Sequence, residues 1–194
     1  MDFQITLMIK AIIFDCFGVL FPQATGEFFE KHKDLFTNHK LLDELNIEID
    51  LGQITRRELY TRLLEGTPLS VDEVIKGIDS RLVFDPKLID LIKSLKTKYK
   101  IGLLSNAGKE EIEIIFRDKL DSLFDSITVS YREKLIKPDP EIFKVAAREL
   151  KMEPSECVFI DDSQANIDAA EKLGMTAILY PNFGVIPHTL EVLV

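Results

Sequence analysis

Residues 157–162 read CVFIDD, four apolar residues that run directly into two aspartates. The same pattern occurs twice more, where IIF stops at Asp15 and IGLL stops at Ser105-Asn106. Short apolar runs are typical of buried parallel strands, and in open α/β sheets the functional groups gather where such strands end. We therefore expect these polar side chains to meet at one edge of a parallel sheet.

The polar groups predicted at that edge are those of a metal-assisted phosphate site. Asp15, Asp161 and Asp162 would repel one another unless a proton or a cation neutralised them. Oxygen ligands with few protein donors suit magnesium. Lys137, which precedes Pro138, adds an ammonium group that can balance both carboxylates and a phosphoryl group. Taken singly, each has a simpler interpretation: a helix N-cap for Asp162-Ser163, an exposed side chain for Lys137.

The order of apolar runs predicts an α/β fold. We expect strands at residues 9–15, 100–105, 126–130, 157–161 and 175–180, with helical patterns between them. Asp85-Pro86 and Asp139-Pro140 each supply an N-cap followed by a first-turn proline. Such alternation indicates a parallel sheet with helices on both faces.

Residues 22–84 interrupt the alternation. They show no convincing strand, and they contain two capping-box signatures, Thr55-x-x-Glu58 and Ser70-x-x-Glu73. We therefore expect a core made of residues 9–21 and 85–194, and an all-helical cap at 22–84. A cap over the strand ends would exclude water and select the substrate.

Composition favours a small-molecule partner. The 33 acidic residues outnumber the 24 basic ones, so the net charge of −9 disfavours both nucleic acid and an anionic membrane surface. The two cysteines are too few for a disulfide scaffold. With no cationic leader, and with the longest apolar stretch too short for a bilayer, we expect a cytoplasmic protein. Met8 is an alternative start.

Four stretches together resemble the motifs of the haloacid dehalogenase superfamily, most of whose members are phosphatases. They are FDCFGVL (14–20), LLSNAG (103–108), KPDPEIF (137–143) and FIDDSQANI (159–167). The similarity runs from residue 9 to about 180, and a helical insertion after the first motif matches one group of that superfamily. The resemblance implies a Rossmann-like core with a small helical cap.

The resemblance also implies a nucleophile and a metal site. Asp15 would attack phosphorus and form an aspartyl-phosphate intermediate. Magnesium would bind the Asp15 carboxylate, the backbone carbonyl of Phe17 and the Asp162 carboxylate. Asp161 would be a further or outer ligand.

Three more residues would handle the phosphoryl group of a small phosphorylated metabolite. By the same resemblance, Ser105 and the backbone of Asn106 would hold phosphoryl oxygens, and Lys137 would neutralise the charge that develops. This agrees with the chemistry of phosphoryl transfer, which depends mainly on positioning and electrostatic stabilisation.

Phe17 departs from the family pattern. In the phosphatases this position, two residues after the nucleophile, is generally an aspartate that protonates the leaving oxygen and then activates water. A phenylalanine can do neither, and the loss is worth about 100- to 10,000-fold for an ordinary alcohol leaving group. Position 17 therefore indicates an impaired or specialised phosphatase.

Three functions are consistent with these residues. The first is magnesium-dependent hydrolysis of a small phosphomonoester, with a sugar phosphate as one candidate. The second is a non-catalytic phosphate-binding or regulatory protein on the same fold. The third is a metal-free dehalogenase, which fits the aromatic residue at 17 but fits Asp161-Asp162 poorly, because that branch replaces the acidic metal ligands.

Overall fold

The computed structural model describes residues 9–35, 38–84, 86–116 and 120–180. Five strands form one sheet in the order β3-β2-β1-β4-β5, and every neighbouring pair is parallel. Phe14, the last residue of β1, pairs with Leu103 on one side and Ile160 on the other, so the strands end close to one line. The strands are β1 (Ala11–Phe14), β2 (Lys100–Ser105), β3 (Ser126–Val129), β4 (Cys157–Asp161) and β5 (Thr176–Leu179).

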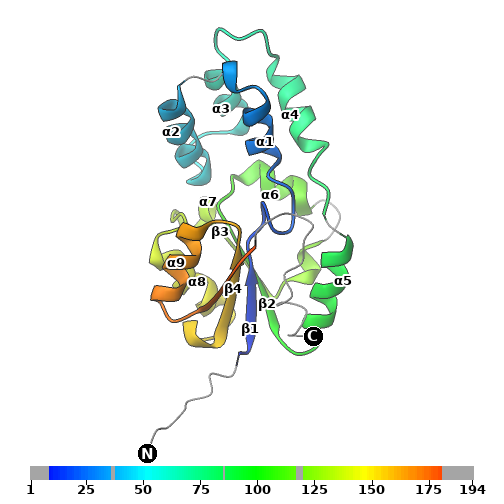
Figure 1. Ribbon diagram of the computed structural model, residues 1–194, viewed down its shortest axis with the longest axis vertical. Coiled ribbons are helices and arrows are strands. Elements are labelled where there is room, and N and C mark those ends of the chain that lie inside the picture. The colour runs from blue at the N-terminus through cyan, green and yellow to red at the C-terminus, as the bar shows by residue number, and fades with distance from the viewer. Residues whose placement is uncertain (1–8, 36–37, 85, 117–119, 181–194) are drawn as a thin grey trace, which may run out of the picture.

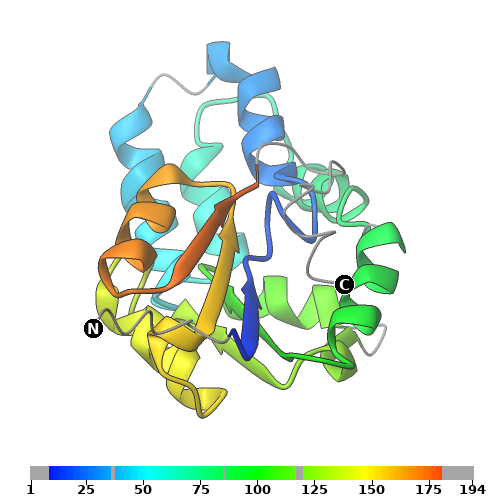
Figure 2. The same cartoon turned by 60° about the horizontal axis from the view of Figure 1, so that its bottom comes forward.

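Helices cover both faces of the sheet, as the alternating pattern predicted (Figures 1 and 2). One face packs against α5 (Pro86–Leu95) and α6 (Lys109–Ile115), and the other against α8 (Pro140–Glu149) and α9 (Gln164–Lys172). Three short segments complete the core: η3 (Leu120–Leu123), α7 (Ser130–Glu133) and η4 (Pro154–Glu156).

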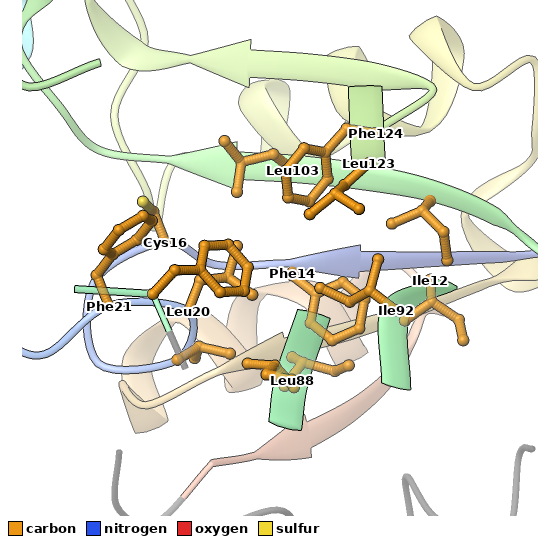
Figure 3. Close-up of a cluster of buried hydrophobic side chains, with 14 of the residues drawn as sticks. Ile12, Phe14, Cys16, Leu20, Phe21, Leu88, Ile92, Leu103, Leu123 and Phe124 are labelled. Carbon is orange, nitrogen blue, oxygen red and sulfur yellow. The ribbon is translucent and has the colours of Figure 1, made fainter. Parts of the chain in front are cut away.

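Side chains of β1 alternate between the two apolar layers. Ile12 and Phe14 point to the layer shown in Figure 3, where they contact Leu88 and Ile92 of α5. Ala11 and Ile13 point to the opposite layer, beneath α8 and α9. Because both faces of β1 are fully buried, its apolar sequence is uninterrupted until Asp15. Both free cysteines of the described chain are buried as well.

The expected helix starts are partly confirmed. Asp139 caps α8 by accepting a hydrogen bond from the Glu141 amide, and Thr55 forms the predicted capping box with Glu58. The capping box predicted at Ser70 is wrong, because the Ser70 side chain makes no cap hydrogen bond even though a helix follows it. Ser70 is exposed, so water can satisfy the free amides there. The predicted cap Asp85 lies outside the described residues.

In the described residues between β1 and α5, the regular elements are helices joined by turns, with one isolated bridge between Phe17 and Phe21. The helices are α1 (Ala24–Lys31), η1 (Lys33–Leu35), α2 (His39–Asp50), α3 (Arg56–Leu63) and α4 (Val71–Asp79). These helices share an apolar cluster of their own, which includes Leu45, Leu59 and Ile78. Figure 1 shows them grouped beyond the carboxyl ends of the strands. We therefore retain the proposed division into a core of residues 9–21 and 85–194 and a cap of residues 22–84.

None of the helices in the described ranges is both long and apolar enough to cross a membrane. The alternative start at Met8 lies outside the described residues.

Candidate functional site

The ends of β1 and β4 bring together a buried cluster of one lysine and two aspartates. The Lys137 ammonium nitrogen lies 2.6 Å from Asp15 Oδ1 and 2.6 Å from Asp161 Oδ2. The three side chains are 2%, 9% and 0% exposed, respectively. Asp15 and Asp161 are neighbours because the register pairs Phe14 with Ile160. Lys137 reaches them from the loop that precedes α8.

Burial and charge shape the protonation of this cluster. Burial raises the pKa of Asp15 to about 7, and the Lys137 charge opposes that shift while the Asp161 charge adds to it. Burial by itself would lower the pKa of Lys137, but attraction to Asp15 and Asp161 outweighs this and raises it to about 12. Lys137 is therefore a permanent cation, whose charge is available to a nearby anion.

Asp161 is fully engaged by protein donors. Asp161 Oδ1 accepts a hydrogen bond from the Ser163 amide at 2.8 Å, and the Asn166 amide lies 3.0 Å from both carboxylate oxygens. With Lys137 on Oδ2 as well, the Asp161 carboxylate has a fixed orientation. These contacts indicate that Asp161 positions Lys137 and favour an outer rather than a direct role toward a metal.

Asp162 completes a group of three carboxylates that could hold a metal ion. Asp15, Asp161 and Asp162 each offer an oxygen, and these atoms lie within 4.8 Å of one another. Asp162 is half-buried, and burial raises its pKa. The N-cap alternative for Asp162-Ser163 is confirmed only in position, because Ser163 occupies the N-cap of α9 but its side chain makes no cap hydrogen bond.

The Gln23 side-chain amide contacts two of the oxygen atoms that the motifs assign to a metal. Gln23 Nε2 donates to the Phe17 carbonyl at 3.1 Å and to Asp162 Oδ2 at 3.1 Å. One donor thus spans a carbonyl and a carboxylate oxygen beside Asp15. An all-oxygen set of this kind fits magnesium. The residues present are therefore suited to the cation that the sequence motifs imply.

Gly18 allows Asp162 to approach the turn after β1. Its φ of +88° is a left-handed conformation, and an added Cβ would overlap the Asp162 carboxylate. The Gly18 amide also donates to the Phe21 carbonyl at 2.6 Å, which closes the turn. A glycine is therefore required here for two independent reasons.

Ser105 ends β2, and residues 106–108 form the loop that follows it. Ser105 is fully buried, and its hydroxyl lies 3.4 Å from the Asn106 carbonyl. The Asn106 side chain forms two hydrogen bonds with the Lys137 backbone. It donates to the Lys137 carbonyl at 3.0 Å and accepts from the Lys137 amide at 2.8 Å. Asn106 therefore fixes the lysine loop to the β2 loop, which sequence reasoning did not anticipate.

A cavity of about 470 Å³ lies between this edge of the sheet and the helical segment. The core contributes Phe17, Asn106 and Glu111 to its walls. The helical segment contributes Gln23, Thr25, Phe29, His39, Asn46, Asp50, Arg56 and Tyr60, among others. The cavity is therefore polar near the Asp15 cluster and has room for a small metabolite.

Several of these residues were missed by sequence reasoning. Gly18 carried a signal, because a glycine directly after a strand end commonly marks a tight turn. Gln23, Asp50 and Arg56 carried none, because their importance depends on how the helical segment sits over the core. Of the predicted site residues, the structure joins Asp15, Lys137 and Asp161 directly, and it places the others around them.

Comparisons with known proteins identify the family of this chain. The family model for haloacid dehalogenase-like hydrolases matches residues 9–174. A phosphorylated carbohydrates phosphatase from Thermotoga maritima is 25% identical, over 94% of this chain and 87% of its own length. YhcW of Bacillus subtilis, a proposed phosphatase, is 28% identical, over 90% of this chain and 84% of its own length.

A solved structure shares the fold of this chain. A HAD family enzyme from Bacteroides thetaiotaomicron, in complex with magnesium and inorganic phosphate, superposes with a TM-score of 0.75. It is 28% identical, and the match covers 94% of this chain and 98% of that enzyme. Because the family model spans most of the sequence and the fold agrees, this chain belongs to the haloacid dehalogenase-like hydrolases.

Proposed function

We propose that this hydrolase cleaves small phosphomonoesters with magnesium, through an aspartyl-phosphate at Asp15. The observation that carries the proposal is the buried contact of Lys137 with Asp15 and Asp161, with Asp162 beside them. A nucleophilic carboxylate, a fixed cation and a set of oxygen ligands are the parts that phosphoryl transfer needs.

Asp15, the Phe17 carbonyl and Asp162 would hold the magnesium ion, with Asp161 outside them. When bound, the ion supplies a positive charge that screens the carboxylates and draws electron density from a phosphoryl oxygen. Its binding would replace the hydrogen bonds that Gln23 donates to Phe17 and Asp162.

The chain's own groups provide positioning and charge. An Asp15 oxygen attacks phosphorus and the bond to the leaving oxygen breaks, so the phosphoryl group passes to Asp15. Water then attacks the same phosphorus, which releases inorganic phosphate and restores the Asp15 carboxylate. Lys137, Ser105 and the Asn106 backbone hold the equatorial oxygens and stabilise the charge that they gain.

The relatives support a phosphorylated carbohydrate as one substrate class. The Thermotoga maritima relative carries that substrate class in its name. Carboxyl, amide, guanidinium and phenol groups among the apolar side chains of the cavity walls would also suit a hydroxylated ligand. We propose that residues 22–84 select the substrate, because most of the residues that line the cavity come from this segment. A cytoplasmic location remains a prediction.

Phe17 favours one alternative, a regulatory protein that binds a phosphorylated ligand without turnover. The dehalogenase alternative has less support, because the metal-type carboxylates Asp161 and Asp162 are both present. Solved dehalogenase structures at 22% and 19% identity share the fold alone.

A screen of phosphorylated metabolites with and without magnesium tests the proposal. We expect turnover that requires magnesium and that disappears in Asp15→Asn, which is nearly isosteric but lacks the attacking charge. Asp162→Ala should lose magnesium binding in calorimetry. Binding of ligands without turnover by the wild-type protein would favour the regulatory alternative instead.

A further inference from the structure

Asp50 is an acidic residue of the helical segment that lines the cavity above the carboxyl edge of the sheet. It is the last residue of α2, and it lines the same cavity as Phe17 and Asn106. Phe17 occupies the family's acid/base position and cannot transfer a proton. A second carboxyl group on the cavity wall is therefore relevant to the chemistry.

The residues on both sides of Asp50 are held against the core. Ile49 packs on the β2 loop so closely that a Cβ added to Gly108 would lie 2.8 Å from Ile49 Cγ1. The Leu51 carbonyl accepts a hydrogen bond from Lys134 Nζ at 2.6 Å. A Cβ added to the next residue, Gly52, would lie 3.1 Å from Tyr131 Cβ. Asp50 is therefore fixed on the wall of the cavity that Phe17 and Asn106 also line.

The surroundings of Asp50 favour its protonated form near neutral pH. Burial raises its pKa to about 7, the Glu111 and Asp15 charges add to the shift, and the Lys137 charge opposes it. Its place at the carboxyl end of a helix also disfavours a negative charge. The influence of Asp15 and Lys137 shows that Asp50 lies within electrostatic reach of both. The charged groups that act on it are Asp15, Glu111 and Lys137. Arg56 of α3 lines the same cavity, and Lys134, which follows α7, binds the neighbouring Leu51 carbonyl.

Other titratable groups on the cavity wall are less suited to transfer a proton. Glu111 Oε2 accepts a hydrogen bond from the Gly108 amide at 2.8 Å, so this carboxylate already holds the β2 loop. His39 begins the 12-residue helix that Asp50 ends, roughly 16 Å away at 1.5 Å per residue. Arg56 pairs with Asp79 at 2.8 Å and stays charged. In the described part of the chain, no hydrogen bond engages the Asp50 carboxyl group.

We propose that Asp50 is the general acid and base that replaces the absent carboxylate at position 17. This inference rests on the proposed phosphatase function. In the first step Asp15 attacks phosphorus, the bond to the leaving oxygen breaks, and that oxygen takes the proton of Asp50 and departs as an alcohol. In the second step the Asp50 carboxylate takes a proton from the attacking water, phosphate leaves Asp15, and Asp50 is again protonated.

The test compares two leaving groups in Asp50→Asn, which keeps the shape of the side chain. Glycerol phosphate needs a proton on its leaving oxygen, whereas nitrophenyl phosphate does not. We expect kcat/KM for glycerol phosphate to fall by about 100- to 10,000-fold, and kcat/KM for nitrophenyl phosphate to change little. Because kcat also includes the hydrolysis step, kcat for nitrophenyl phosphate should fall as well. Asp43→Asn, on the exposed side of α2, is the matched control.

The pH profile gives a second readout. Since Asp50 must carry a proton in the first step, wild-type kcat/KM for glycerol phosphate should decline as pH rises above about 7. This decline should be absent with nitrophenyl phosphate and in Asp50→Asn. If Glu111→Gln loses this decline in kcat/KM while Asp50→Asn keeps it, the proposal is overturned and the proton comes from Glu111.

The remaining outcomes separate the two proposals. A wild-type protein that hydrolyses nitrophenyl phosphate alone would contradict the role of Asp50, because no acid would then be acting. Equal losses of kcat/KM for both substrates in Asp50→Asn would contradict the role of Asp50 too. If Asp15→Asn is inactive and Asp50→Asn is unchanged, the phosphatase proposal stands and this inference fails. If wild type turns over neither probe nor any screened phosphate, the phosphatase proposal itself fails.

Discussion

Gly18 lies directly against the Asp162 carboxylate, with no space between them for a single methyl group. The contact joins the turn after β1 to the end of β4. It holds the Asp162 carboxylate beside the Phe17 carbonyl, and the Gln23 amide donates a hydrogen bond to each of them. The geometry of the proposed magnesium site therefore depends on the absence of a side chain at position 18.

Gly18→Ala should weaken magnesium binding at least tenfold in calorimetry, because the new methyl group displaces Asp162. Part of its effect on stability comes from the left-handed backbone, which costs about 1–2 kcal/mol for a residue with a Cβ. Gly174→Ala controls for that cost, since its φ of +87° is nearly the same and nothing lies within 4 Å of its Cβ position. Equal magnesium affinities in the two variants would contradict the proposed site.

Gln23→Ala should raise magnesium affinity by roughly 2- to 10-fold. The Gln23 amide binds two oxygen atoms that the ion would use, and a net hydrogen bond is worth about 0.5–1.5 kcal/mol. Removing this competitor leaves the Phe17 carbonyl and the Asp162 carboxylate available. Titration of both proteins at one pH measures the change. A weaker affinity in Gln23→Ala would show that Gln23 supports the bound ion instead.

Asp50 should make stability depend on pH. Its pKa of about 7 in the folded protein lies above its ordinary value of 3.8, so the folded state binds more protons than the unfolded state between these two values. The free energy of unfolding therefore falls as pH rises across that range. In Asp50→Asn, this fall in the free energy of unfolding is absent. Its melting temperature relative to wild type should rise from pH 4 to pH 7 and then level off, and a constant difference would refute the raised pKa.

Phe17→Asp should restore proton transfer where Asp50 is absent. In the Asp50→Asn background, the added carboxylate at position 17 should recover much of the lost glycerol phosphate hydrolysis. In the wild-type background, where Asp50 already acts, the gain should be small. Steady-state kinetics of the four proteins give the coupling between the two positions. Gains of equal size in both backgrounds would mean that the two carboxyl groups do not share one function.

The strands and the convergence at Asp15 were predictable because they follow from local sequence. Apolar runs that end at Asp15, Ser105 and Asp161 imply parallel strands, and parallel strands place their ends together. Lys137 was expected there as a balancing cation, and the resemblance to known motifs then gave it a role toward the phosphoryl group. The predicted strand at residues 9–15 was longer than the observed Ala11–Phe14, as is usual for element ends.

The contacts between the helical segment and the core could not be predicted. Gln23 and Asp50 are ordinary polar residues in the sequence, and only the tertiary fold brings them to Asp162 and to the cavity. The Ser70 cap failed for a related reason, since a capping signature does not say whether water will compete at an exposed helix end.

The aspartyl-phosphate at Asp15 is the central claim, and trapping it is the most direct test. Wild-type protein would be mixed with magnesium and phosphate-labelled nitrophenyl phosphate, quenched in acid and digested, and the labelled peptide would be sequenced. We expect the label on the peptide that contains Asp15, a greater amount in Asp50→Asn because its hydrolysis step is slowed, and none in Asp15→Asn. Steady turnover with no labelled protein, or with label on another residue, would contradict the mechanism.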